Sequence, residues 1–297
     1  MPSLLAASLL WAFSFGLIKG ELAGLSPWAV AAARLVVAAA VFLPFALRTS
    51  VPRRIRLEAV ALGTVQFGLM YVLYVASFRW LAAWQVALLT VFTPLYVVLL
   101  ARLPAGPVRW RAAAAALLAV GGAGLLTWRA GPDRAGWQGV LLLQVSNLCF
   151  AAGQLRYAAF RGRCGVGDAA LLAWMYAGAA AATVLALPVA GLVSGTGQLA
   201  GWTPRAALVV LYLGVLPTAA GFHLWNRGAA RTQPVFLGAA NNLKVPLAVL
   251  VSWLVFGERT PGGGALAGAV MLALSLWAAG GPTARVGPAA ARERPLR

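Results

Sequence analysis

Ten apolar runs divide the chain into segments that are each long enough to cross a lipid bilayer. A helix rises about 1.5 Å per residue and the hydrocarbon core is about 30 Å thick, so roughly 17–25 apolar residues span it. Because lipid offers no hydrogen bonds, each run must pair its own backbone groups and is predicted to be a helix. The runs are residues 4–20, 28–47, 58–78, 81–101, 112–128, 137–156, 168–190, 205–226, 233–256 and 264–280.

The composition excludes a soluble fold with an ordinary charged surface. Of the 297 residues, 62% are hydrophobic and only 10% are charged, and the mean hydropathy is +0.83. In soluble domains about a quarter of the residues are charged. The sequence therefore predicts an all-α polytopic membrane protein with ten transmembrane helices that contact the lipid bilayer.

The net charge of +18 comes mainly from Lys and Arg in the gaps between the runs. A nucleic-acid-binding protein would gather them on one face of a soluble module, so nucleic acid is not an expected partner. With a cytoplasmic N-terminus, 16 of the 24 basic residues lie in cytoplasmic gaps and six in outer gaps. This bias predicts an inner-membrane protein whose N- and C-termini are both cytoplasmic.

Residues that could bind a metal or perform catalysis are scarce. The chain has one histidine and two cysteines, and their spacing matches no metal-binding motif. An intramembrane lipid-modifying enzyme would need a nucleophile or an acid–base pair, and no acid lies in the middle of a run. We expect no enzyme activity, no metal and no cofactor, and the choice between monomer and homodimer stays open.

The two halves of the chain repeat one layout when they are offset by 152 residues. Each half has five runs, so the second half must enter the membrane in the opposite orientation, as in transporters with inverted repeats. We expect a first repeat at 4–128, a second at 137–280, a central cavity between them, and a disordered cytoplasmic tail at 281–297. The offset pairs Gln66 with Thr218, Tyr71 with His223, Arg79 with Arg231 and Pro94 with Pro246.

Two amides and an ammonium group interrupt the ninth run. Lys244 lies near its middle, where a charge costs about 2.5–3.5 kcal/mol. Two interpretations stay open: Lys244 binds an anionic group of a substrate, or it locks neighbouring helices together. Asn241 shares a face with Lys244, whereas Asn242 points about 100° away.

Prolines break two of the runs near their middle. Pro94 and Pro246 cannot donate a backbone hydrogen bond, so each frees a carbonyl one turn earlier. The freed carbonyls suit a gating segment, and a static kink that neighbouring helices satisfy is the alternative.

Other polar groups inside the runs are further candidates for substrate binding. A histidine side chain can exchange protons under physiological conditions, so His223 could relay protons, or it could be a satisfied interfacial residue. Amides and hydroxyls inside bundles often only join helices. These further candidates are Ser14, Gln66, Tyr71, Asn147 and His223.

The stretch "LLWAFSFGLIKGELAGLSPWAVAAARLVVAA" resembles the opening of the EamA branch of the drug/metabolite transporter superfamily. The second half, "PLAVLVSWLVFGERTPGGGALAGAVMLALSL", resembles the closing pattern of that family. The first half departs from the pattern because it has no Gly-Glu after its proline helix, and the second half has no matching Trp or Lys. The matched residues are Trp11, Lys19, Pro27, Arg34, Pro246, Gly257 and Glu258.

The resemblance implies a ten-helix basket whose central cavity opens to each side in turn, and export of amino acids or other small metabolites. We expect structural roles for the matched residues apart from Pro246. Lys19 would anchor the membrane interface, and Arg34 would extend toward the outer surface.

The charges inside the runs indicate which small molecule is carried. Apart from charged residues at the ends of the runs, Arg34 and Lys244 are the charged residues inside them. A carrier of organic cations would need a buried carboxylate, so an anionic group on the substrate is expected. The sequence predicts a secondary transporter that exports amino acids or related small carboxylates by alternating access, and a phosphorylated-metabolite exchanger is the alternative.

Overall fold

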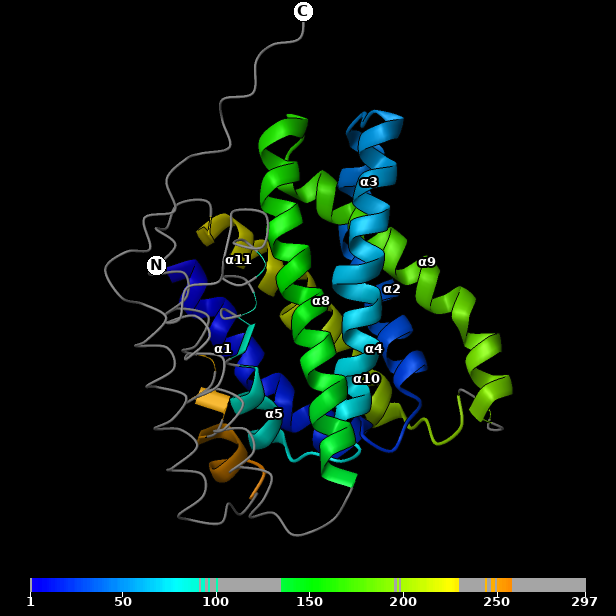
Figure 1. Cartoon of the computed structure of the whole chain (residues 1–297), viewed down its shortest axis with the longest axis vertical. Coiled ribbons are helices and arrows are strands. Elements are labelled where there is room, and N and C mark those ends of the chain that lie inside the picture. Colours follow the sequence, from blue (N-terminus) through cyan, green and yellow to red (C-terminus); the bar gives the residue numbers. More distant parts are fainter. Residues whose placement is uncertain are drawn as a thin grey trace, which may run out of the picture.

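The structure is a computed structural model, and it describes residues 2–90, 92–93, 96, 100, 135–194, 197, 199–229, 244, 247–248 and 250–257. All elements within these ranges are helices, as Figure 1 shows. The first half contains α1 (Pro2–Leu17), π-helical η1 (Ile18–Leu22), α2 (Pro27–Arg48), α3 (Arg53–Gly63), π-helical η2 (Thr64–Leu69), α4 (Met70–Ser77) and α5 (Ala83–Leu89). The second half contains α8 (Ala135–Cys164), α9 (Asp168–Ser194), α10 (Pro204–Leu213), π-helical η4 (Gly214–Ala220) and α11 (Gly221–Ala229).

Two of the helices begin with the same capping signal. Ser26 caps α2 and Thr203 caps α10, and each side-chain oxygen accepts a hydrogen bond from the backbone N–H three residues later. Pro27 and Pro204 follow as the first helical residues, where a missing N–H has no cost. These hydroxyl–proline pairs fix where both helices start.

Five helical segments are long and apolar enough to cross a membrane. They coincide, within a few residues, with the first, second, third, seventh and eighth predicted runs. Helix α8 covers the sixth run but is more polar, because Gln144, Ser146 and Asn147 lie in its middle. The runs 112–128 and 264–280 lie outside the described residues, as do most of 233–256 and the C-terminal half of 81–101. The five segments are Ser3–Leu22, Pro27–Arg48, Arg53–Ser77, Asp168–Val193 and Pro204–Trp225.

Two of these segments share an α–π–α pattern. Segment η2 widens the helix between α3 and α4, and η4 widens it between α10 and α11. The offset of 152 residues places η2 over residues 216–221, which overlap η4. Pro217 within η4 has no N–H to donate, which favours a loosened turn there.

Glycines let α3 and α9 approach closely. A Cβ on Gly178 would lie 2.5 Å from the carbonyl oxygen of Val60, and a Cβ on Gly63 would overlap the backbone of Met175. Small residues at such crossings allow the backbone contact that stabilises helix pairs in lipid. Helix α9 also packs along α2, where the rings of Phe42 and Tyr176 stack with centroids 5.7 Å apart.

Ion pairs join helix ends at both ends of the bundle. Glu21 after α1 bonds Arg205 of α10 at 2.7 Å, and Glu58 of α3 bonds Arg163 of α8 at 3.2 Å. Each pair connects two gaps that the alternating topology places on one side of the membrane. The alternation is therefore supported, and which side is cytoplasmic stays a prediction.

Candidate functional site

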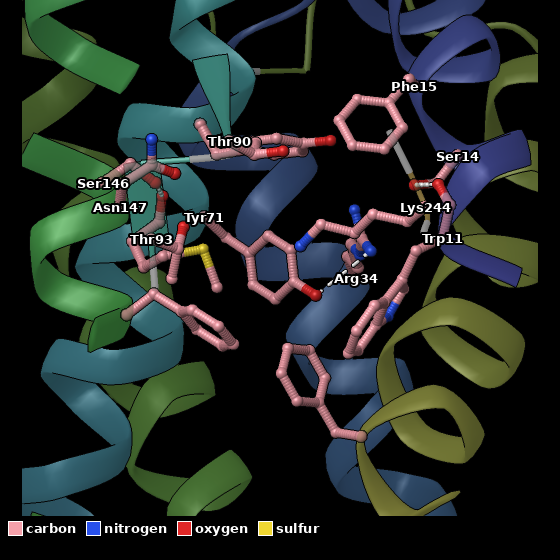
Figure 2. A pocket seen from close by; sticks show the side chains of 14 residues that line it. Trp11, Ser14, Phe15, Arg34, Tyr71, Thr90, Thr93, Ser146, Asn147 and Lys244 are labelled. Carbon is pink, nitrogen blue, oxygen red and sulfur yellow. Dashed lines mark hydrogen bonds between the residues drawn. The ribbon is translucent and has the colours of Figure 1, made fainter. Parts of the chain in front are cut away.

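A cavity lies among the helices near the middle of α1, α2 and α8 (Figure 2). It encloses about 550 Å³ of space between atoms, including its open mouth. Two of its lining residues are basic, four are small neutral polar residues besides Ser14, and the others are aromatic or apolar. The lining residues are Trp11, Ser14, Phe15, Arg34, Met70, Tyr71, Tyr74, Thr90, Thr93, Ser146, Asn147, Phe150, Phe222 and Lys244.

Lys244 lies in the cavity wall and is only 8% exposed. Its Nζ atom sits 5.2 Å from the centroid of the Trp11 ring, within the range of a cation–π contact. Such a contact offsets part of the cost of holding an ammonium group away from water. The ninth predicted run therefore contributes a cation to this cavity.

Arg34 also reaches the cavity, and its side chain is 2% exposed. Its Nε donates to the Thr218 hydroxyl at 2.5 Å, and its Nη2 donates to the Tyr71 hydroxyl at 3.2 Å. The guanidinium carbon lies 4.2 Å from the Tyr71 ring centroid. The structural role expected for Arg34 stays a prediction, and these partners in α4 and η4 turn its side chain inward rather than toward the outer surface.

One nitrogen of Arg34 is left without a partner. Its Nη1 atom is buried and makes no hydrogen bond to any residue in the described part of the chain. A buried unpaired donor on a charged group is costly unless a ligand or water satisfies it. The cavity therefore contains a positioned donor that can receive an anion.

Trp11 connects the cavity to η4. Its Nε1 donates to the carbonyl oxygen of Pro217 at 2.8 Å, and its ring contacts Phe222 and Trp225 with centroids 5.2 and 5.3 Å apart. The expected structural role of this residue fits the hydrogen bond. Its ring also forms part of the cavity wall, beside Lys244.

Aromatic rings form most of the apolar wall. Phe15 packs edge-on against Tyr74, and Phe150 packs edge-on against Phe222. The thioether of Met70 adds a polarisable group. This wall suits the flat or compact apolar body of a small organic molecule.

Small neutral polar groups from α8 and from the residues after α5 line another part of the cavity. Ser146 Oγ donates to the Met70 carbonyl at 2.8 Å, and Thr90 Oγ1 donates to the Ala87 carbonyl at 2.7 Å. Asn147 donates through Nδ2 to the Leu89 carbonyl at 3.0 Å. These groups lie across the cavity from Lys244 and Trp11 in Figure 2, and Thr93 lies with them.

The structure brings some of the predicted residues to the cavity and keeps others away. Ser14, Tyr71, Asn147 and Lys244 line it, and Ser14 Oγ donates to the Trp11 carbonyl at 2.6 Å.

Two candidates for substrate binding lie outside this cavity. Gln66 is buried against Gly153, and His223 lies beside the ring of Phe42, with ring centroids 6.1 Å apart. Their role in substrate binding stays a prediction. Gln66 and His223 sit on η2 and α11 facing neighbouring helices, because polar residues in a bundle can pack between helices.

Several predicted residues lie outside the described residues. These are Asn241, Asn242, Pro94, Pro246 and Glu258.

Three other residues of the family pattern are described. Lys19 donates to the Phe78 carbonyl at 2.8 Å, Pro27 starts α2, and Gly257 has φ +65°. That φ value is one that glycine adopts without strain. None of the three lines the cavity.

Sequence reasoning missed the aromatic wall and the partners of Arg34. Phe15, Tyr74, Phe150 and Phe222 are apolar residues in apolar helices, so their spacing gives no signal of a cavity. Thr90 gave a weak signal, as a hydroxyl inside an apolar run.

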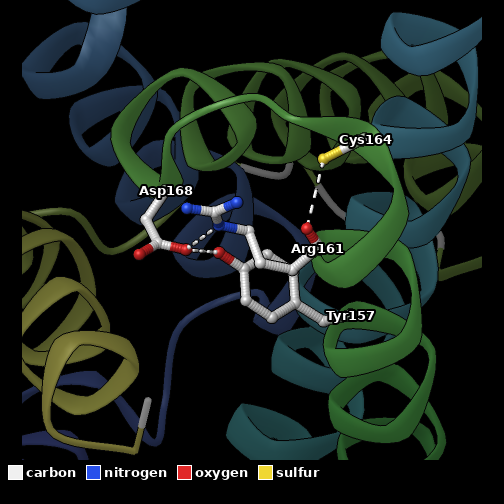
Figure 3. A network of polar contacts seen from close by, with 4 residues as sticks. All are labelled: Tyr157, Arg161, Cys164 and Asp168. Atoms are coloured by element: carbon white, nitrogen blue, oxygen red, sulfur yellow. Dashed lines mark hydrogen bonds and ion pairs between the residues drawn. The ribbon is translucent and has the colours of Figure 1, made fainter. Parts of the chain in front are cut away.

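The acids in the described ranges are all paired away from the cavity. Asp168 accepts hydrogen bonds from Arg161 at 2.9 Å and from Tyr157 at 2.6 Å, as Figure 3 shows. Glu21 and Glu58 pair with arginines at the two ends of the bundle. No acid therefore balances the two cations among the described lining residues. Within the same ranges, no three potential metal-binding side chains come together.

Comparison with known proteins places the chain in a family. A family model described as the EamA-like transporter family matches residues 2–128. A protein of Salmonella typhimurium named biotin transporter is 34% identical over 283 residues, which cover 93% of this chain and 92% of that protein. The chain belongs to the EamA-like transporter family. The predicted resemblance is confirmed, and this EamA-like protein is a multi-pass membrane protein and a secondary transporter.

Other relatives of this EamA-like protein have related names. A protein of Pseudomonas aeruginosa named probable biotin transporter is 34% identical, covering 93% of this chain and 96% of the relative. A protein of Rhizobium johnstonii named riboflavin transporter is 29% identical, covering 78% of this chain and 72% of the relative.

A solved crystal structure has the same fold. It aligns with a TM-score of 0.65 at 18% identity and covers 93% of this chain and 95% of the other.

Proposed function

We propose that this EamA-like protein carries a small carboxylate, with biotin as the first candidate, through the cavity between α1, α2 and α8. The observation that carries the proposal is the pair of buried cations, Arg34 and Lys244, with no acid among the described lining residues. A carboxylate would compensate this charge and satisfy the unpaired Nη1 of Arg34.

The chemistry of biotin agrees with the residues that line the cavity. Biotin has one carboxylate on an alkyl chain and an uncharged bicyclic head, and the cavity offers cations beside an aromatic wall. The names of the relatives support the same substrate. Riboflavin, named for a more distant relative, is uncharged and would not balance the charge of the two cations.

Amino acids, the class expected from the sequence, agree less well with the described residues. Their ammonium group would be buried close to two cations. Balancing it would need an acid in the cavity wall, and the described lining residues include none.

A phosphorylated metabolite is the second candidate. It requires clustered cations, and Arg34 joins Lys244 in the cavity. Such an exchanger would work only when phosphate is present on the opposite side of the membrane.

We also propose the number of transmembrane helices, their inverted-repeat arrangement and the orientation in the membrane. Ten transmembrane helices in two inverted repeats are supported by the overlap of η2 and η4 under the 152-residue offset and by the nearly full-length fold similarity. Alternating access in this arrangement would expose the cavity to each side in turn. Placement in an inner membrane with cytoplasmic termini follows from the bias of Lys and Arg.

Proteoliposomes containing the full chain test the proposal. We expect saturable flux of radiolabelled biotin that unlabelled biotin inhibits and that biotinol, which has an alcohol in place of the carboxylate, inhibits at least about tenfold more weakly. Flux measured from either side of oriented vesicles tests the predicted export direction. Flux of leucine without flux of biotin would overturn the proposal, and strict dependence on phosphate in the opposite compartment would favour the exchanger.

A further inference from the structure

We propose that Asn147, together with Ser146, Thr90 and Thr93, forms a second subsite that binds an uncharged, hydrogen-bond-donating head group of the substrate. The inference rests on the proposed carboxylate carrier and adds what the far end of the molecule must be. The cavity would then select a molecule with a carboxylate at one end and neutral N–H groups, as in a urea or lactam, at the other.

The two kinds of lining group are separated in space. Figure 2 shows Arg34, Lys244 and Trp11 together on one side of the cavity, and Thr90, Thr93, Ser146 and Asn147 together on the other. The ring of Tyr71 lies between them in this view.

The neutral end presents mainly acceptors. The hydroxyl hydrogens of Ser146 and Thr90 are donated to backbone carbonyls, so their oxygens can only accept further bonds. Within the described part of the chain, the hydrogen bonds of Asn147 involve only Nδ2, so its Oδ1 can accept as well. Three acceptors without a charge match neutral N–H donors.

Asn147 is held in place by a chain of polar contacts behind the cavity. Its Nδ2 lies 3.0 Å from the Leu89 carbonyl and 3.3 Å from Gln144 Oε1. Gln144 Oε1 also accepts from the Tyr96 hydroxyl at 2.9 Å. Two contacts on one nitrogen fix the plane of the Asn147 amide, and Asn147 itself is only 5% exposed. A buried amide that is already oriented loses little freedom when it binds a ligand.

The two ends of the cavity would contact different parts of the substrate. The carboxylate would bind Arg34 and Lys244, while the head would lie far enough away to meet only neutral groups. A head with a positive charge would be disfavoured, because the neutral acceptors cannot balance it.

Competition against labelled biotin in proteoliposomes tests the inference. The probes are biotin, with a urea head; lipoate, a carboxylate whose head lacks N–H groups; and 6-aminohexanoate, with an ammonium head. In the wild type we expect the order of affinity biotin, then lipoate, then 6-aminohexanoate. In Asn147→Leu we expect the preference for biotin over lipoate to fall by about tenfold, while the affinity for lipoate changes less than about twofold.

Two further variants guard against misfolding of the first. Ser146→Ala and Thr93→Val remove single polar atoms with little change of volume, and each should lower the preference for biotin by about threefold or more. Leu148→Ala, a neighbour that is 41% exposed on α8, is the matched control and should leave the preference unchanged.

The outcomes separate this inference from the carrier proposal. If biotin and lipoate bind equally well to the wild type, or if all three polar variants weaken both probes to the same degree, the head-group subsite is wrong and the carboxylate carrier stands. If 6-aminohexanoate binds best, the neutral end accepts an ammonium and the inference is overturned. If no carboxylate competes at all, both proposals fail.

Discussion

Arg34 is held by two of its three nitrogen atoms, and the third has no partner among the described residues. The Thr218 hydroxyl accepts a hydrogen bond from Nε, and the Tyr71 hydroxyl accepts one from Nη2. One side chain therefore links α2 to η4 and α4. A guanidinium fixed in this way presents a donor whose direction no longer varies. The sequence shows a charged residue inside an apolar run. It does not show that partners 37 and 184 residues away turn this arginine inward.

Removing the charge of Arg34 should weaken carboxylate binding. For Arg34→Gln we expect the affinity for biotin to fall about 10- to 100-fold, because a charge-assisted hydrogen bond contributes about 1.5–3 kcal/mol. Isothermal titration of the purified protein in nanodiscs measures this loss. Arg163→Gln removes an exposed arginine that pairs with Glu58 at the end of the bundle, and its affinity should stay within about twofold. Equal affinities for Arg34→Gln and wild type would exclude Arg34 from the site.

Trp11 contributes a hydrogen bond that phenylalanine cannot replace. In Trp11→Phe the Pro217 carbonyl loses its partner, and we expect a free energy of unfolding lower by about 1–3 kcal/mol. Thermal unfolding in detergent measures the change as a lower Tm. Trp253→Phe, at a position that is 43% exposed, should leave the Tm nearly unchanged. A Tm equal to that of wild type for Trp11→Phe would mean that another donor satisfies the carbonyl.

At the scale of elements, close helix crossings and widened turns determine where the cavity can form. Length and apolar composition predicted the helices, because any apolar run in lipid must pair its own backbone. The π-helical turns η2 and η4 were not predicted, and in η4 side chains of neighbouring helices bond the carbonyls of Pro217 and Thr218. Tyr176 from α9 donates to the Thr218 carbonyl at 3.0 Å, a contact between residues 42 positions apart.

The crossing of α3 and α9 should tolerate no side chain at Gly178. In Gly178→Ala the added methyl group would meet the Val60 carbonyl, and overpacking of this kind costs about 1–3 kcal/mol. We expect a lower Tm and a lower yield of monodisperse protein by size-exclusion chromatography. Gly162→Ala is the matched control, since a Cβ there meets nothing within 4 Å, and alanine should be neutral or slightly stabilising. A Tm for Gly178→Ala equal to that of the control would show that the helices separate without loss.

At the scale of the whole molecule, the distribution of Lys and Arg predicts which end of the bundle faces the cytoplasm, and labelling from each side of the membrane tests that orientation. We expect a membrane-impermeant maleimide to label Gly24→Cys from outside the cell and Gly167→Cys only after the cytoplasmic face is opened. Both positions are exposed and lie at ends predicted to face opposite sides. The native Cys149 and Cys164 are replaced by serine in both variants to remove background labelling. Labelling of both positions from one side would contradict the alternating topology.

The sequence predicted the class of fold and one half of the cavity chemistry. Lys244, Tyr71, Ser14 and Asn147 could be found because polar groups stand out in oily helices. Their grouping could not, since it depends on which face each helix turns inward, and that is settled by packing between distant segments. Gln66 was indistinguishable from Asn147 by this criterion and packs between helices instead.

The backbone of η4 is bonded to side chains from two other helices, through Trp11 at Pro217 and through Tyr176 at Thr218. Breaking either bond in lipid leaves a carbonyl with no water to replace its partner. The segments α1, α9 and η4–α11 are therefore expected to move as one unit during each transport cycle. Cross-linking α1 to α11 should then leave the transport rate unchanged, whereas cross-linking either helix to α5 or α8 should abolish transport.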